Sequence, residues 1–252
     1  MRHWIAAALL LLTAWTMRPA LAQSVDVELV LLADASGSID QAELLFQRQG
    51  YAQALLSPEV LAAIGDGLDG RIALTYVEWA AAESQDVVVP WTVIDGIDSA
   101  RSFGEALMRA PRRAFGRNAI GSAIAKAQAL IETDGPEGFR KVIDISADSA
   151  RSWSGVPLPE ARANATAAGI VVNGLAILCP DVDCSGRPAA GDLEAAFADR
   201  IIAGPGAFVV TAADRASFAD AVRKKLVLEI ADRRGVDGVR YAASASSMHH
   251  AD

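Results

Sequence analysis

The sequence predicts an α/β protein with a doubly wound, mostly parallel sheet and helices on both faces. Strand-like and helix-like segments alternate along the chain, which is the order expected when each strand is joined to the next by a crossover helix. The first strand-like segment, VDVELVLLA at residues 25–33, ends in a nearly continuous apolar run. Such a run is typical of a strand that is covered on both faces.

The bulk composition agrees with a folded globular domain. The chain has 252 residues, of which 52% are hydrophobic and 21% are charged. That length can bury a full core, and the balance differs from that of a disordered chain. Residues 23–235 are expected to form one domain, because no linker or internal repeat interrupts them, and residues 236–252 are expected to fray.

The elements follow in order. Strands are predicted at residues 25–33, 71–79, 86–94, 140–146, 169–178 and 207–211. Helices are predicted at residues 39–64, 99–109, 119–132, 159–168, 193–202 and 217–231. Pro58 should break the first helical segment, because proline cannot continue a helix. Pro90 places its strand near a sheet edge, because proline cannot donate to a neighbouring strand.

The first 22 residues have the pattern of a secretory signal peptide. Arg2 precedes an apolar stretch, and Ala20 and Ala22 form an A-x-A cleavage site before Gln23. The alternative is an uncleaved membrane anchor, but the apolar run falls short of the ~20 residues needed to span a bilayer. The sequence therefore predicts a secreted or periplasmic protein with no membrane span in its mature chain.

Charge and cysteine content narrow the function classes. Two of the 23 basic residues lie in the signal segment, so 21 remain against 31 acidic residues, a net charge of −10. An acidic chain without a basic tract is a poor nucleic-acid binder. Cys179 and Cys184 are close together, which in an exported protein predicts a local disulfide.

Polar residues follow two of the predicted strands. Asp34, Ser36 and Ser38 come directly after the first strand, and Asp148 follows the strand at residues 140–146. Asn118 ends the loop before the helix at residues 119–132. In open α/β sheets, ligands bind beyond the carboxyl ends of the strands, where the strand order reverses. These residues are therefore candidates for a binding site at that edge.

Two interpretations of the first cluster stay open from the residues alone. Ser38 with Gln41 fits a helix-capping box, and Asp34 can hydrogen-bond within the turn. Alternatively, the side chains of Asp34, Ser36 and Ser38 converge on a cation. Carboxylate and hydroxyl oxygens suit a hard ion such as Mg²⁺, with Mn²⁺ or Ca²⁺ as other candidates.

The pattern D-x-S-x-S after a first buried strand resembles the metal-ion-dependent adhesion site of von Willebrand factor type A domains. The segments FGRNAIGSAIAKA, KVIDISADS and GIVVNGLAI resemble later parts of that domain in the same order. The resemblance covers roughly residues 25–232 and is closest to a branch of secreted bacterial proteins known only as a domain of unknown function. The resemblance implies a Rossmann-type fold, with the mostly parallel sheet and the helices on both faces that the alternating segments predict.

The resemblance also implies a metal site, carried over residue by residue. Its ligands would be Asp34, Ser36, Ser38 and Asp148, with Asn118 in the position where the family has a threonine. The asparagine carbonyl is also a hard oxygen donor, although the side chain is longer than that of threonine. The glycine-flanked aspartate of the family is replaced here by Ala147-Asp148-Ser149.

The implied function is non-enzymatic. The module would bind an unidentified partner protein by letting a partner's Asp or Glu carboxylate complete the coordination of the cation. The alternatives are a metal-dependent hydrolase and a metal-free scaffold of the same fold. A Ser-His-Asp mechanism lacks its base, because the three histidines lie in the signal segment and the tail.

Other polar residues near the predicted edge have competing interpretations. Glu78 ends the second strand and either reaches the site or bonds to a neighbouring loop. Asp144 lies inside a buried strand, and it either holds the ligands of the site in place or serves as a hydrogen-bonded structural carboxylate. Arg151 and Trp153 are candidates for a partner-binding patch, because both residue types are frequent in binding hot spots. The loop before the predicted helix at residues 119–132 is basic, and we expect its arginines to be solvated. They are Arg112, Arg113 and Arg117.

Overall fold

The computed structural model describes residues 24–133, 135–178 and 192–231. The predicted signal peptide, the pair Cys179 and Cys184, and the predicted tail from residue 236 all lie outside the described residues.

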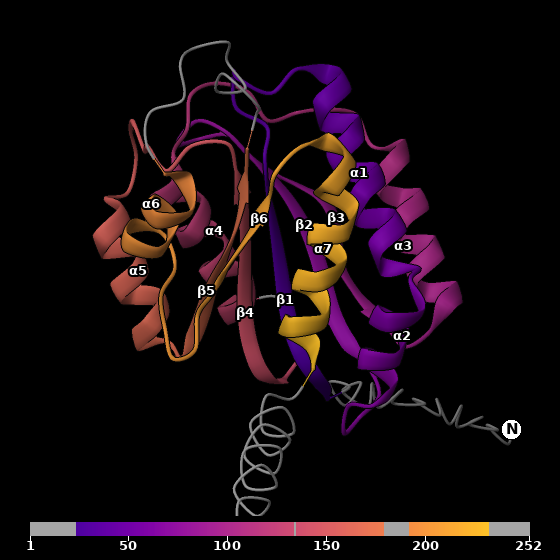
Figure 1. Cartoon of the computed structure of the whole chain (residues 1–252). Helices are drawn as coiled ribbons and strands as arrows, with labels where there is room; N and C mark the ends of the chain where they lie inside the picture. Colours follow the sequence, from indigo (N-terminus) through magenta and orange to yellow (C-terminus); the bar gives the residue numbers. More distant parts are fainter. Residues whose placement is uncertain (1–23, 134, 179–191, 232–252) are drawn as a thin grey trace, which may run out of the picture.

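In the part of the chain that the structure describes, six strands form one sheet in the order β3-β2-β1-β4-β5-β6 (Figure 1). They are β1 (Val25–Asp34), β2 (Ile72–Trp79), β3 (Gln85–Ile94), β4 (Gly138–Ala147), β5 (Ile170–Ile177) and β6 (Val209–Ala212). All neighbours pair in parallel except β2 and β3, which are antiparallel. The predicted mostly parallel sheet is confirmed.

Within the described ranges, seven helices cover the two faces of this sheet (Figure 1). They are α1 (Gln41–Leu55), α2 (Pro58–Gly65), α3 (Ile97–Arg109), α4 (Ile120–Thr133), α5 (Leu158–Ala167), α6 (Leu193–Arg200) and α7 (Arg215–Ile230). Buried side chains of α1, α2, α3 and α7 share one apolar cluster, whereas those of α4, α5 and α6 share the other. The doubly wound architecture is therefore confirmed.

The central strand β1 explains why both faces need helices. All ten of its residues are buried, and successive side chains enter opposite layers. Leu29 and Leu31 pack under α1 and α7, whereas Val30 and Leu32 pack under α4. A strand buried on both sides gives the continuous apolar run seen in the sequence.

Both proline predictions are confirmed. Ser57 caps α2 by accepting from the amide of Val60, and Pro58 takes the first helical position, where its missing N–H costs nothing. Pro90 lies in the edge strand β3.

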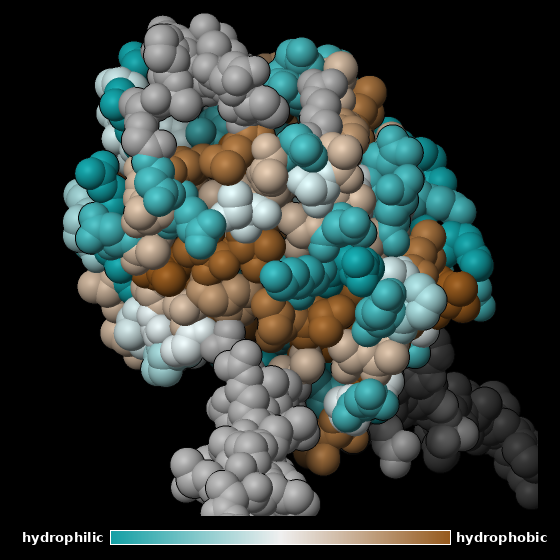
Figure 2. All heavy atoms as spheres, in the orientation of Figure 1, coloured by the Kyte–Doolittle hydropathy of each residue, from teal (hydrophilic) through white to brown (hydrophobic). Residues whose placement is uncertain are grey.

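The last helix, α7, has one face packed on the core and one face exposed to solvent. Phe218 and Leu226 are buried against the sheet, whereas Asp220 and Lys224 are exposed. Figure 2 shows hydrophilic side chains over α7, with apolar surface beside it near β6.

The order of the strands fixes where a site can form. Strand β1 pairs with β2 on one side and with β4 on the other, so the chain changes direction across the sheet at β1. The register pairs Ala33 of β1 with Ser146 of β4, so the segments that follow these strands leave the sheet at the same edge. This switch point is the place where open α/β sheets bind ligands.

Candidate metal site

Asp34 is the last residue of β1, and its side chain is fully buried at the switch point. The backbone amide of Ser36 donates to Asp34 Oδ1 at 2.7 Å. This bond closes a tight turn that directs the β1–α1 loop, residues 35–40, back over the end of the strand. Asp34 can therefore hydrogen-bond within the turn through Oδ1 while Oδ2 serves as a cation ligand.

Burial and the neighbouring carboxylate of Asp148 raise the pKa of Asp34 to about 8. Hydrogen bonds from the backbone and side chain of Ser36, and from the backbone of Asp148, act in the opposite direction. Two carboxyl groups in a buried place repel each other when both are ionised. A divalent cation between them would remove that repulsion.

The two serines of the motif point the same way. Ser36 is buried and Ser38 is half-buried, and their Oγ atoms lie 3.3 Å apart. The alternate positions of an extended turn therefore bring two hydroxyl oxygens together next to Asp34.

Asn118 joins the cluster from the 110–118 loop, the segment between α3 and α4. Its side chain is nearly buried, and Nδ2 donates to Asp34 Oδ2 at 3.5 Å, which is at the long limit of a hydrogen bond. The two ends of an amide are interchangeable by a half-turn. After such a turn, Oδ1 would face the carboxylates and could serve as a cation ligand.

The donor set suits a hard cation. It consists of two carboxylates and three neutral oxygens, and Mg²⁺, Mn²⁺ and Ca²⁺ all accept such ligands. Among residues 24–133, 135–178 and 192–231, no group of three or more His, Cys, Asp or Glu side chains is placed to hold a metal. A zinc site of the usual nitrogen or sulfur type is therefore not found in this part of the chain.

The predicted capping box at Ser38 and Gln41 is wrong. Asp40 caps α1: its Oδ1 accepts from the amide of Glu43 at 2.8 Å, and Glu43 Oε2 accepts from the amide of Asp40 at 3.1 Å. Aspartate is as good a cap as serine, and Glu43 stands at the third helical position, where the box requires it. Ser38 is consequently not engaged as the helix cap.

Arg112 was expected to be solvated, and that prediction is wrong. Its Nη2 donates to the carbonyl of Ala35 at 2.5 Å and to that of Ser36 at 3.3 Å, and its Nη1 donates to the carbonyl of Ile39 at 3.0 Å. One guanidinium thus holds the whole β1–α1 loop. Arginine has five donors in a rigid fork, but nothing in the local sequence of a basic loop separates Arg112 from the exposed Arg113.

A second contact ties the same two loops together. The amide of Gly37 donates to the carbonyl of Gly116 at 2.8 Å. Gly116 has a φ of +114°, and a Cβ there would lie 2.7 Å from the Cβ of Ala81. Only glycine fits this crowded left-handed position.

Glu78 and Asp144 have structural partners instead of a place in the cluster. Glu78 Oε1 accepts from Arg48 Nε at 2.7 Å, and both side chains are buried. Asp144 Oδ1 lies 2.6 Å from Lys225 Nζ, also with both side chains buried. The interpretation of Asp144 as a hydrogen-bonded structural carboxylate is the one that the geometry supports.

Trp153 lies beside the cluster. Its amide donates to the carbonyl of Asn118 at 2.8 Å, and its side chain is 53% exposed. The guanidinium of Arg117 stacks over the indole at 4.2 Å from the ring centre. Arg151 is exposed in the same loop. Trp153 and Arg117 thus place an aromatic and a basic group beside Asn118.

Comparison with known proteins places the chain in a family. Residues 24–234 match the family described as "Protein of unknown function (DUF1194)". The chain belongs to this family. A search of curated proteins gives no match to this DUF1194 chain.

Solved structures resemble the DUF1194 chain in fold. Proximal thread matrix protein 1 from the mussel byssus, in a structure with a "zinc occupied MIDAS motif", gives a TM-score of 0.56 at 15% identity over 82% of this chain and 48% of that one. The pilus adhesin SpaC from Lactobacillus rhamnosus GG gives 0.59 at 14% identity over 82% of this chain and 30% of that one. The DUF1194 chain thus spans about half of the mussel protein and less than a third of the adhesin.

MIDAS denotes the metal-ion-dependent adhesion site of von Willebrand factor type A domains. The DUF1194 chain has the fold of that domain type, as its sequence resemblance implied. None of the helices in the described ranges has both the length and the apolar character to cross a bilayer.

Proposed function

We propose that this chain is an exported protein-binding module that holds a divalent cation and binds a carboxylate of its partner through it. The cation site consists of Asp34, Ser36, Ser38, Asn118 and Asp148. Mg²⁺ is the first candidate ion, and Mn²⁺ and Ca²⁺ are the others. The signal-like residues 1–22 support export.

One observation carries the proposal: oxygen-bearing side chains from three separate loops gather at the switch point around a buried carboxylate. Asp34 has a pKa raised to about 8, first by burial and then by the nearby Asp148. Placing an acidic group in that environment costs stability unless something neutralises it. A cation held by both carboxylates would compensate this cost.

The five proposed ligands also leave room for a ligand from a partner protein. Mg²⁺ takes six oxygen ligands, and five side chains leave at least one position for water or for a carboxylate of another protein. Three of the five ligands are neutral oxygens, so an ion that does not contact both carboxylates directly would keep part of its positive charge. A third, external carboxylate would therefore be attracted, and the apolar core behind the site would strengthen that attraction. The ion itself would supply only the electrostatic attachment point.

The fold relatives support a binding role. One is named as a pilus adhesin, and the other is a byssus matrix protein whose MIDAS motif holds zinc. Their identity to this chain is 14% and 15%, so they support the fold and make the function a proposal.

The cation claim is tested by calorimetric titration of the chelator-treated chain with Mg²⁺ and with Mn²⁺. Wild type should bind one ion, and Asp34→Ala should not. Asp98→Ala is the matched control, because Asp98 is an exposed aspartate on α3 with no part in the site. An absence of binding by wild type at millimolar metal would disprove the cation site.

The partner claim is tested by pull-down from periplasmic extract with and without EDTA. We expect a retained protein that is released by EDTA and is not captured by Asp34→Ala. A partner that stays bound in EDTA would instead indicate a metal-free scaffold.

A further inference from the structure

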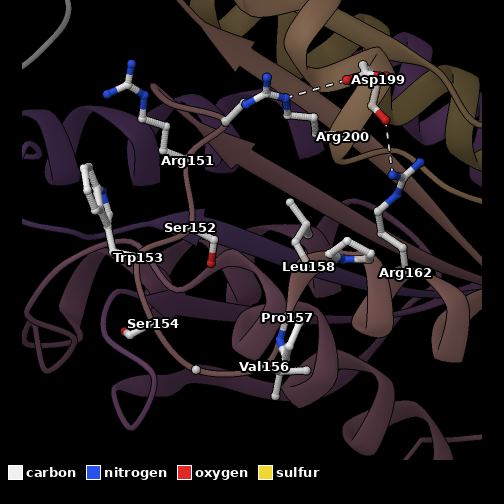
Figure 3. Close-up of a pocket in the computed structure, with 13 residues that line it drawn as sticks. Arg151, Ser152, Trp153, Ser154, Val156, Pro157, Leu158, Arg162, Asp199 and Arg200 are labelled. Carbon is white, nitrogen blue, oxygen red and sulfur yellow. Dashed lines mark hydrogen bonds and ion pairs between the residues drawn. The ribbon is translucent and has the colours of Figure 1, made fainter.

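A groove of about 730 Å³ lies along the segment that follows β4 (Figure 3). One side is the β4–α5 segment, residues 150–159, and the other side is formed by Arg162, Asp199 and Arg200. In Figure 3, Arg151 and Trp153 lie toward one end of the groove, and Arg162 and Asp199 lie toward the other. We call it the β4–α5 groove. Its volume is in the range of sites that hold small ligands or short peptide segments.

The groove is linked to the candidate metal site by the chain sequence and by one backbone hydrogen bond. Asp148 precedes the groove-lining segment by two residues. Trp153 lines the groove, and its amide is bonded to the carbonyl of Asn118, another candidate ligand. The end of the groove at Trp153 is therefore the end that lies beside the candidate ligand Asn118.

Two glycines hold the groove-lining segment close to α4. A Cβ on Gly121 would lie 2.0 Å from the carbonyl oxygen of Val156, and one on Gly155 would lie 2.0 Å from Ser122 Oγ. Gly155 also has a φ of +81°, and Ser122 Oγ accepts from the amide of Val156 at 3.1 Å. The groove is thus pre-formed, which reduces the entropy lost when a ligand binds.

The polar lining is basic, in contrast to the chain as a whole. Three arginines and one aspartate line the groove, although the full chain has a net charge of −8. Arg162 donates to the carbonyls of Asp199 and Ile202, so its charge is fixed in the wall. Arg200 is exposed and lies 3.6 Å from Asp199, and Arg151 is exposed three residues after Asp148. The groove is therefore complementary to an anionic ligand.

Apart from Ser152 and Ser154, the remaining lining is apolar, and it suits a peptide more than a bare anion. Val156, Pro157, Leu158 and Pro159 line the groove between the arginines, and the exposed indole of Trp153 stands at its end. Tryptophan and arginine in one site are typical of the anchors of protein interfaces.

We infer that the β4–α5 groove binds an extended acidic peptide segment of the partner. The segment places one carboxylate at the cation, packs apolar side chains on Trp153 and the prolines, and directs further carboxylates to Arg151 and Arg200. This inference rests on the proposed function and adds the chemistry of the partner: an acidic stretch with interleaved apolar residues, in place of a single acidic residue.

The test uses the full mature chain and synthetic fluorescein-labelled peptides of about seven residues, roughly the reach of a short extended segment. The peptides contain Val, Pro and Gly with one, two or three acidic residues, and binding is measured by fluorescence anisotropy in millimolar Mg²⁺. Affinity should rise with the number of acidic residues, by about fivefold or more from one to three. The double variant Arg151→Gln/Arg200→Gln should lose this dependence, and Trp153→Ala should weaken every peptide.

The matched control is Arg223→Gln, because Arg223 is an arginine on α7 that pairs with Glu59 and Asp220, outside the groove. It should bind all peptides as wild type does. The groove inference is overturned if affinity does not depend on the number of acidic residues, or if it is the same in the arginine variants as in wild type. It is also overturned if no peptide binds.

The two proposals fail in different ways. If the groove inference alone is wrong, peptide binding is abolished by EDTA but is the same in Arg151→Gln/Arg200→Gln as in wild type. If the cation site is wrong, binding follows peptide charge and the arginines but is unchanged by EDTA and by Asp34→Ala.

Discussion

Arg112 Nη2 donates to the carbonyl oxygen of Ala35 at 2.5 Å, one residue after the buried Asp34. The same guanidinium reaches the carbonyls of Ser36 and Ile39, and its Nε reaches the carbonyl of Ala114 at 3.2 Å. It therefore joins the loop that supplies Asp34 and the two serines to the loop that supplies Asn118. The donors of the candidate site are held in place by a residue that is not itself a donor to the ion.

The first prediction concerns this support. Arg112→Met should weaken Mn²⁺ binding by roughly tenfold, because residues that orient metal ligands contribute about that much to affinity. Arg113→Met is the control, since Arg113 is the exposed neighbour in the same loop. Calorimetric titration measures both variants. Equal affinities in the two variants would contradict the role of Arg112.

The second prediction concerns Asn118. Asn118→Asp adds a third carboxylate to Asp34 and Asp148, and cation affinity rises with the number of charged ligands. We expect about tenfold tighter Mg²⁺ binding, together with lower stability of the cation-free protein, because three carboxylates repel each other. Asn118→Leu has no oxygen donor and should bind more weakly than wild type. Titration and thermal unfolding with and without EDTA check the two effects.

The third prediction is a pH dependence of stability that arises from Glu229. Burial, followed by the charge of Asp144, raises the pKa of Glu229 to about 7, although Lys225 and Asn173 both bond to it. The folded state then holds a proton that the unfolded state has released. The contribution of Glu229 to stability is fully present below its ordinary pKa of 4.5 and is lost as the pH rises through about 7, by up to roughly 3 kcal/mol.

Urea unfolding between pH 5 and pH 8 measures this slope. Glu229→Gln keeps an oxygen for Lys225 and removes the titrating carboxyl, so its stability should change less over the same range. Asp144 and Lys225 stay as a pair in that variant. A variant with the wild-type slope would show that another group titrates.

The fourth prediction tests the close packing under the groove. Gly121→Ala should destabilise the fold by about 1–3 kcal/mol, because its Cβ would lie 2.0 Å from the backbone oxygen of Val156. Gly65→Ala is the matched control: Gly65 is also helical, and its Cβ would meet nothing within 4 Å. That variant should be neutral or more stable, because alanine loses less entropy in a helix. Urea unfolding gives both free energies.

Much of the fold follows from local patterns in the sequence. The apolar run of β1 predicts its central place, and Pro58 and Pro90 predict the helix break and the edge strand. These features depend on backbone geometry and on burial, which neighbouring residues specify. The positions of Asp34 and Asp148 at strand ends could likewise be predicted, since parallel strands end at one edge.

The supports of the site could not be predicted in this way. Arg112 contacts the carbonyl of Ala35, 77 positions away in the sequence, and Arg48 pairs with Glu78 across 30 positions. A long charged side chain can be solvated or buried, and only the three-dimensional packing decides which. The cap at Asp40 was missed for another reason: serine and aspartate cap helices about equally well, so the residue types alone do not decide between Ser38 and Asp40.

The last prediction concerns the buried pair of Arg48 and Glu78. Arg48 also donates to the carbonyls of Ala110 and Pro111, where the 110–118 loop begins. Glu78→Leu leaves a buried guanidinium without its counter-charge, and we expect a loss of about 3 kcal/mol in stability. The double variant Arg48→Met/Glu78→Leu removes both charges and should recover part of that loss. It should still bind Mn²⁺ more weakly than wild type, because the loop that carries Asn118 loses two of its backbone contacts. Urea unfolding and calorimetric titration separate the two effects, and a double variant with wild-type affinity would show that Arg48 is not needed to position this loop.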